Sequence, residues 1–462
     1  LEGAVDLNST LTVAGAVSLA STLSVGGAAN FLSTVTVVGN TRLGAIVSVV
    51  GAANFASTVT VVGAAHLQST VSVGGAATFA STVTVVGAAH LQSTVSVGGA
   101  AVFADTVTVV GDGTFKSNVS VSGNLDITGN VSVAGTLFAA GGITYDGNVS
   151  VSGNLAVGGN VSIGGTLSVT GAVSLASTLS VGGASNFLST VTVVGNTRLG
   201  ALVSVVGAAN FASTVTVVGA AHLQSTVSVG GAATFASTVT VVGIGTFKDD
   251  VSVSGNTVLG GTLRVAGATS LEGAVDLNST LTVAGAVSLA STLSVGGAAN
   301  FASTVTVEGA AHLKAAVSVG GAAVFASTVT VVGIGTFKDD VSVSGNTVLG
   351  GTLRVVGATS LQGAVDLNST LTVAGAVSLA STLSVGGAAN FASTVTVVGI
   401  GTFKDDVSVS GNTVLGGTLR VAGATSLEGA VDLNSTLTVA GAVSLASTLS
   451  VGGAANFLST VT

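Results

Sequence analysis

Apolar and polar residues follow one another along the chain in blocks of six. In residues 57–68, STVTVVGAAHLQ, each block reads small, polar, apolar, polar, large apolar, variable. We label these positions a to f, with a at Gly3, Ser9 and every sixth residue after them. The frame runs without an insertion through all 462 residues, which divide into 77 blocks of six.

Positions c and e carry the apolar residues. Position e is Val, Leu, Ile or Phe except at Ala139 and Tyr145, and every charged residue and every His lies at a, b, d or f. Because c and e are two residues apart, they lie on the same side of an extended chain, while b, d and f lie on the other side. The pattern therefore predicts an all-β protein built from six-residue strands, with c and e turned into the core. A period of six matches no helix.

Strands this short, joined by tight corners, do not form hairpins in series. They form a parallel β-solenoid or β-helix, in which each strand stacks on an equivalent strand of the next layer. Three windings fit the period. A two-sided coil uses twelve residues per turn, and a three-sided coil of one chain uses eighteen. In the third winding, three chains wind about one axis, and each chain rises one layer per block.

Long internal duplications help to choose among these windings. The segment GIGTFKDDVSVSGNTVLGGTLRV occurs at 243–265, 333–355 and 399–421, with offsets of 90 and 66. Residues 15–87 recur nearly unchanged at 171–243, and residues 1–36 recur identically at 427–462. The four offsets are 90, 66, 156 and 426; three of them are not multiples of twelve and three are not multiples of eighteen, so either single-chain coil would rotate most copies onto other faces. We therefore favour the intertwined trimer, in which every block is equivalent by symmetry, with the three-sided single chain as the alternative.

The windings predict rods of different length. At about 4.8 Å per layer, the trimer would be roughly 370 Å long, the three-sided chain roughly 125 Å and the two-sided chain roughly 185 Å. The composition does not change along the chain, so we expect residues 1–462 to form one continuous shaft without separate domains. The sequence contains no Met, and we expect it to be processed or to be a window of a longer chain with caps and terminal domains.

Composition excludes several classes of function. Charged residues make up 6% and the net charge is −8, so the basic surface that binds nucleic acid is missing. The absence of Cys rules out disulfides and thiolate metal sites. No run of about 18 apolar residues predicts a membrane helix, and we expect no membrane insertion.

Candidate chemistry is sparse. We interpret the four His of the AAHL blocks as solvated side chains at the outward position d, and the three Lys-Asp-Asp triplets as corner ion pairs rather than Ca²⁺ sites. No GxSxG elbow is present, and GIG at 243–245 lacks the helix that a phosphate-binding loop requires. We predict no catalytic, cofactor-binding or metal-binding residue and no enzyme. Asn-x-Ser/Thr sequons occur at Asn8, Asn118, Asn130, Asn148, Asn160, Asn278, Asn368 and Asn434.

Runs such as GNVSVSGNLAVGGNVSIGGTLSVTGAVSLASTLSVGGA at 147–184 resemble the repetitive shafts of viral and bacteriophage tail fibres. The resemblance implies a homotrimeric structural fibre that is extracellular or on the virion surface and carries terminal domains. Exposed Val at position f, as at Val62 and Val86, adds possible lateral or end-to-end self-association to this hypothesis. The competing hypothesis is an adhesin or an ice-binding solenoid that uses the outward Thr and Ser rows, since T-x-T strands such as Thr58 and Thr60 present regular hydroxyl groups.

Overall fold

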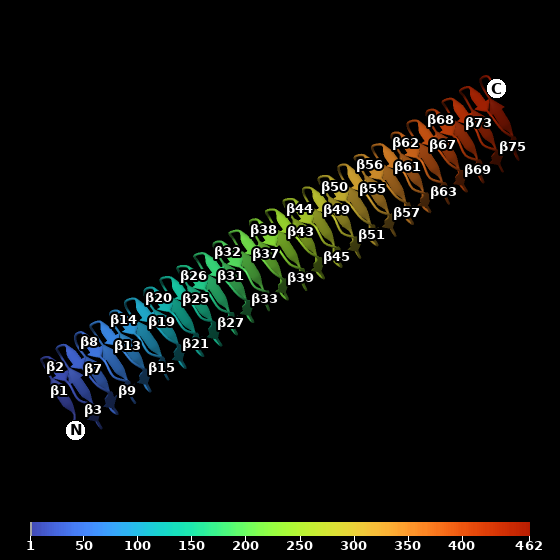
Figure 1. Cartoon of the computed structure of the whole chain (residues 1–462). Helices are drawn as coiled ribbons and strands as arrows, with labels where there is room; N and C mark the ends of the chain where they lie inside the picture. Colours follow the sequence, from blue (N-terminus) through green and yellow to red (C-terminus); the bar gives the residue numbers. More distant parts are fainter. Residues whose placement is uncertain (1) are drawn as a thin grey trace. The chain divides into compact units, whose positions relative to one another are not determined.

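Each six-residue block forms one short strand and one corner. In the computed structural model, which describes residues 2–462, the strands begin with β1 (Val5–Leu7), start every six residues and end with β76 (Ala455–Phe457) (Figure 1). Each strand holds positions c, d and e only. The predicted six-residue strand is therefore wrong in length, because f, a and b form the corner. No helix occurs in residues 2–462.

Strands pair in parallel with the third strand along the chain. β1 pairs with β4 (Leu23–Val25), with Val5 opposite Leu23, and β4 pairs with β7 (Thr41–Leu43), with Leu23 opposite Thr41. One turn thus takes 18 residues and has three faces. Face 1 holds β1, β4 and every third strand after them, face 2 begins with β2 (Leu11–Val13), and face 3 begins with β3 (Val17–Leu19).

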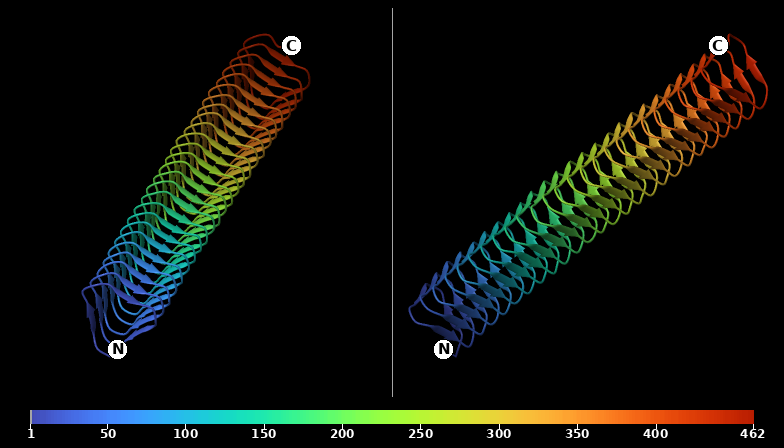
Figure 2. Two further views of the ribbon diagram at one scale, coloured as in Figure 1. Left: turned by 60° about the vertical axis from the view of Figure 1, so that its left-hand side comes forward. Right: turned by 45° about the vertical axis from the view of Figure 1, so that its right-hand side comes forward.

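The protein is an all-β, parallel β-solenoid in which one chain closes its own turns. This is the three-sided single-chain winding, which the repeat pattern left as the alternative to the trimer. The structure contains one chain, so the intertwined trimer stays a prediction. Two units are described separately, Leu1–Gly231 and Ala232–Thr462. Within each unit, strands of successive turns lie side by side on all three faces (Figure 2).

The core holds positions c and e, as the sequence predicts. From Leu19 to Val443 both positions are buried in every strand. Phe79, Val121 and Leu199, at position e on faces 1, 2 and 3, are 5%, 0% and 1% exposed. Burial at this level removes most of the apolar surface of each block from water. Each Å² of apolar surface buried stabilises the fold by about 25 cal/mol.

Residues of different size share each strand so that the core stays filled. Gly113 stands at c of β19 (Gly113–Phe115), where a Cβ would lie 3.0 Å from the ring of Phe115. Ala139, at the end of β23 (Leu137–Ala139), lies in the same turn as Tyr145 of β24 (Ile143–Tyr145). The two residues that break the rule for position e thus stand together. A small residue offsets a large one, as close packing requires.

Corners are held by hydrogen bonds between successive turns. The Val59 amide donates to the Ala76 carbonyl, and the Val62 amide donates to the Leu43 carbonyl, both at 2.9 Å. Turns approach each other closely at position a: a Cβ on Gly75 would lie 2.6 Å from the carbonyl carbon of Ser57. No glycine among residues 2–462 has a positive φ. Glycine is therefore needed at this corner because the neighbouring turn leaves no room for a Cβ.

Candidate functional site

The outer surface of each face is a set of columns of side chains. Position d of each strand lies opposite position d of the next turn, so Thr60, Thr78 and Ser96 follow one another on face 1. Adjacent members of a column are about 4.8 Å apart. Most are Ser or Thr, so each face presents rows of hydroxyl groups.

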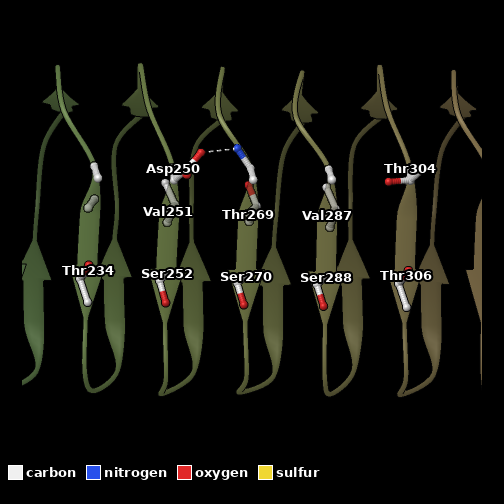
Figure 3. Close-up of a pocket in the computed structure, with 14 residues that line it drawn as sticks. Thr234, Asp250, Val251, Ser252, Thr269, Ser270, Val287, Ser288, Thr304 and Thr306 are labelled. Atoms are coloured by element: carbon white, nitrogen blue, oxygen red, sulfur yellow. Dashed lines mark hydrogen bonds between the residues drawn. The ribbon is translucent and has the colours of Figure 1, made fainter.

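One stretch of face 3 in the second unit is hollowed into a shallow groove of about 420 Å³. We call it the serine groove. It crosses five strands, β39 (Ala233–Phe235), β42 (Val251–Val253), β45 (Thr269–Leu271), β48 (Val287–Leu289) and β51 (Val305–Val307). Its floor is the outward column of these strands, and its side is the neighbouring column at position b (Figure 3). The floor column is Thr234, Ser252, Ser270, Ser288 and Thr306, and the side column is Ala232, Asp250, Ala268, Ala286 and Thr304.

The groove exists because its middle residues are small. Ala268 and Ala286 leave space beside Ser270 and Ser288, while Asp250 is a larger side chain of the same column. A second groove of about 410 Å³ lies on face 2, with Ser408, Ser426 and Ser444 in its lining. It arises from the duplication of the sequence at an offset of 156.

The serine groove offers hydrogen bonds and little acid–base chemistry. Asp250 is the only titratable residue in its lining, and its Oδ1 accepts a hydrogen bond of 2.7 Å from the Ala268 amide. A nucleophilic serine needs a neighbouring base within hydrogen-bond reach, and the lining residues supply no such base for Ser252, Ser270 or Ser288. The arrangement can bind an extended polar molecule or ordered water.

The Lys-Asp-Asp triplets lie at corners, where the sequence placed them, but their carboxylates bond backbone. Asp249 Oδ1 accepts from the Asp250 amide at 2.9 Å, and Asp250 bonds the next turn. The triplets at 338–340 and 404–406 repeat both bonds. The ion pairs that we predicted with the adjacent Lys are not formed in the described residues. The first Asp of each triplet thus bonds the amide of the next residue, and the second bonds an amide one turn away.

Asparagine at position b forms a ladder that sequence reasoning missed. Oδ1 of Asn130 accepts a hydrogen bond from the backbone amide of Asn148 at 3.0 Å, and Oδ1 of Asn148 accepts one from the backbone amide of Thr166 at 2.9 Å. Asp112 begins this ladder by accepting from the Asn130 amide at 2.7 Å. The signal in the sequence is Asp or Asn recurring at position b at an interval of 18 residues.

The four His are outward and exposed, as predicted. They are His66 on β11 (Ala65–Leu67), His90 on β15 (Ala89–Leu91), His222 on β37 (Ala221–Leu223) and His312 on β52 (Ala311–Leu313). His66 lies between Ser48 and Thr84 in its column. The described residues contain no group of three His, Asp or Glu placed to hold a metal ion.

The sequons divide into two kinds. Asn118, Asn130, Asn148 and Asn160 stand at position b and accept bonds from the next turn. A second set stands at exposed corner position f: Asn8, Asn278, Asn368 and Asn434.

Several hydroxyl groups lie inside the core without a hydrogen-bond partner. Thr347 and Thr359 are 4% and 3% exposed, and neither hydroxyl is bonded. The Tyr145 hydroxyl is also unbonded, and burial raises the pKa of this phenol well above its usual value. These groups fill volume at core positions.

These features define a class by architecture: a single-chain, three-sided parallel β-solenoid whose outer faces carry Ser and Thr. Comparisons with models of known families, with curated proteins and with solved structures found no match. No helix among the described residues is long and apolar enough to cross a membrane.

Proposed function

We propose that the chain is a structural shaft, a rigid extracellular or virion-surface rod that spaces or supports terminal domains. The observation that carries this proposal is the sealed, repeated core, in which each turn buries the same two positions on each of three faces. Interactions between neighbouring turns add up along such an array. Length and stiffness are properties of the repeat itself and need no catalytic residue.

Electron microscopy of the purified chain tests the shaft. The single-chain winding predicts a straight, unbranched particle of constant width, roughly 125 Å long at about 4.8 Å per turn. Particles that bend freely or collapse into globular lobes would overturn the proposal. Homotrimeric assembly is part of the hypothesis, and the intertwined form predicts a particle about three times as long at the same layer spacing.

A second candidate function, an adhesin or ice binder, is favoured by one observation. The serine groove aligns five outward hydroxyl-bearing residues in one column, with small side chains beside them (Figure 3). Thermal-hysteresis and cell-binding assays test this function. The variant Ser270→Lys blocks the middle of the groove, and Ser120→Lys, on face 2 of the first unit, is its matched control. Activity that only Ser270→Lys removes would support the second candidate, and a chain inactive in both assays would contradict it.

A further inference from the structure

Two faces of the second unit carry pairs of like charges in their outward columns. On face 1, position d carries Asp276 and Asp366, and Arg420 follows three turns after Asp366. On face 2, the charged residues at position d between Thr246 and Ser444 are Arg264 and Arg354. All four side chains of these two pairs are exposed, and no ion pair joins them in the described part of the chain.

The two pairs of charges have the same spacing. Asp276 on β46 (Val275–Leu277) and Asp366 on β61 (Val365–Leu367) are separated by five turns. Arg264 on β44 (Leu263–Val265) and Arg354 on β59 (Leu353–Val355) are also separated by five turns. Five layers correspond to roughly 24 Å in each column.

The residues next to these charges in each column are small and neutral. Asp276 lies between Val258 and Ser294, and Arg264 lies between Thr246 and Thr282. Each charged side chain is therefore exposed among neutral neighbours in its column. A flat partner that carries the opposite charge at the same spacing can approach closely.

We propose that face 1 of the second unit docks against face 2 of a second copy of this chain. Asp276 and Asp366 then lie opposite the two arginines of that copy. Because both columns have the same spacing, both acids are paired whether the two copies run parallel or antiparallel.

The charges determine which face of the second copy binds and at which axial position. A single exposed ion pair contributes little to affinity, but two pairs at fixed spacing on stiff supports engage together. Like charges placed opposite each other disfavour face 2 on face 2. The docking of two copies is separate from the proposed shaft function, since a single solenoid can also serve as a shaft. If the docking fails its test, the shaft proposal is unaffected.

Charge reversal tests the docking by sedimentation velocity over a series of concentrations. The unmodified chain should self-associate. The variant Asp276→Arg with Asp366→Arg should lose this association, and so should Arg264→Asp with Arg354→Asp. An equimolar mixture of the two variants should regain it, because each now offers the charge that the other lacks.

The matched control is Asp126→Arg with Asp432→Arg, which makes the same change of charge at exposed outward positions of face 3. It should associate like the unmodified chain. An unmodified chain that does not associate would overturn the proposal. So would charge variants that associate normally, a mixture that fails to regain association, or a control that loses it.

Discussion

At the scale of single residues, Tyr145 shows how the repeat changes the chemistry of a side chain. Its phenol stands at position e of face 3, fully buried and without a hydrogen-bond partner. Burial disfavours the charged phenolate and so raises the pKa of Tyr145 in the folded chain. A raised folded pKa leaves stability intact below the unfolded pKa of about 10 and reduces it as the pH rises above that value.

Replacing Tyr145 by Phe should therefore remove part of the alkaline loss of stability. At neutral pH the variant should be more stable by about 1 kcal/mol, since an unpaired buried hydroxyl is lost. Thermal unfolding followed by circular dichroism on both sides of about pH 10 measures the effect. Tyr145 is the only Tyr, and the chain has no Trp, so tyrosinate absorbance gives a direct check. A phenol that ionises near its ordinary pKa in the folded chain would contradict its burial.

Residue spacing predicted which side chains are buried, and it could not predict which groups of successive turns form hydrogen bonds. The two-residue spacing of c and e placed Phe79 and Val121 in the core, because strand geometry depends on neighbours in sequence. The bond from the Asn148 amide to Asn130 depends on which block stacks on which. That is fixed by the winding, and the sequence left the winding open.

At the scale of strands and corners, the ladder at position b joins successive turns. The Asn148 amide, at a corner, donates to the side chain of Asn130. Removing this acceptor with Asn130→Ala should lower the free energy of unfolding by about 1 kcal/mol. Asn130→Asp should keep most of the stability, since Asp112 and Asp250 make the same bond elsewhere. Amide hydrogen exchange at Asn148 should quicken in the Ala variant only, and equal exchange in both variants would contradict the ladder.

Glycine at a corner allows successive turns to pack closely, because it has no Cβ. A Cβ on Gly75 would lie 2.6 Å from the backbone of Ser57, whereas one on Gly142 would lie 3.3 Å from its nearest neighbour, the Asn160 carbonyl oxygen. Gly75→Ala should therefore destabilise the chain by about 1–3 kcal/mol, as overpacking does. Gly142→Ala is the control and should cost less. Equal unfolding midpoints in urea for the two variants would show that the turns do not approach at this corner.

The strand length differs from the sequence prediction for a reason that belongs to this scale. Six-residue periodicity gave the length of the block, and the pattern of c and e gave the part that faces inward. A three-sided turn must also change direction after every strand. Positions f, a and b serve that change of direction, which leaves three residues for the strand.

At the scale of the whole molecule, the winding depends on whether the three faces are equivalent. The sequence favoured a trimer because duplicated segments would otherwise fall on different faces. In the second unit they do: Phe247 and Phe337 lie on face 2, and Phe403 lies on face 1. All three are buried, at 4%, 4% and 5% exposed. One chain thus tolerates the duplications because its faces are interchangeable.

The offsets could not reveal this tolerance. Equivalence by trimer symmetry and equivalence of three similar faces leave the same trace in the sequence. The two windings differ in how far the chain rises per block, which is a distance in space.

A distance between two spin labels on face 1 tests the central claim, a turn of 18 residues closed by one chain. Ser24 and Thr114 are both outward at position d, on β4 and β19, and are linked by five successive strand pairings. The chain has no Cys, so Ser24→Cys with Thr114→Cys places labels at these two sites only, and dilution with unlabelled chain removes distances between chains. The account predicts a separation of roughly 24 Å, whereas roughly 72 Å would contradict it in favour of three intertwined chains and roughly 36 Å would indicate a two-sided coil.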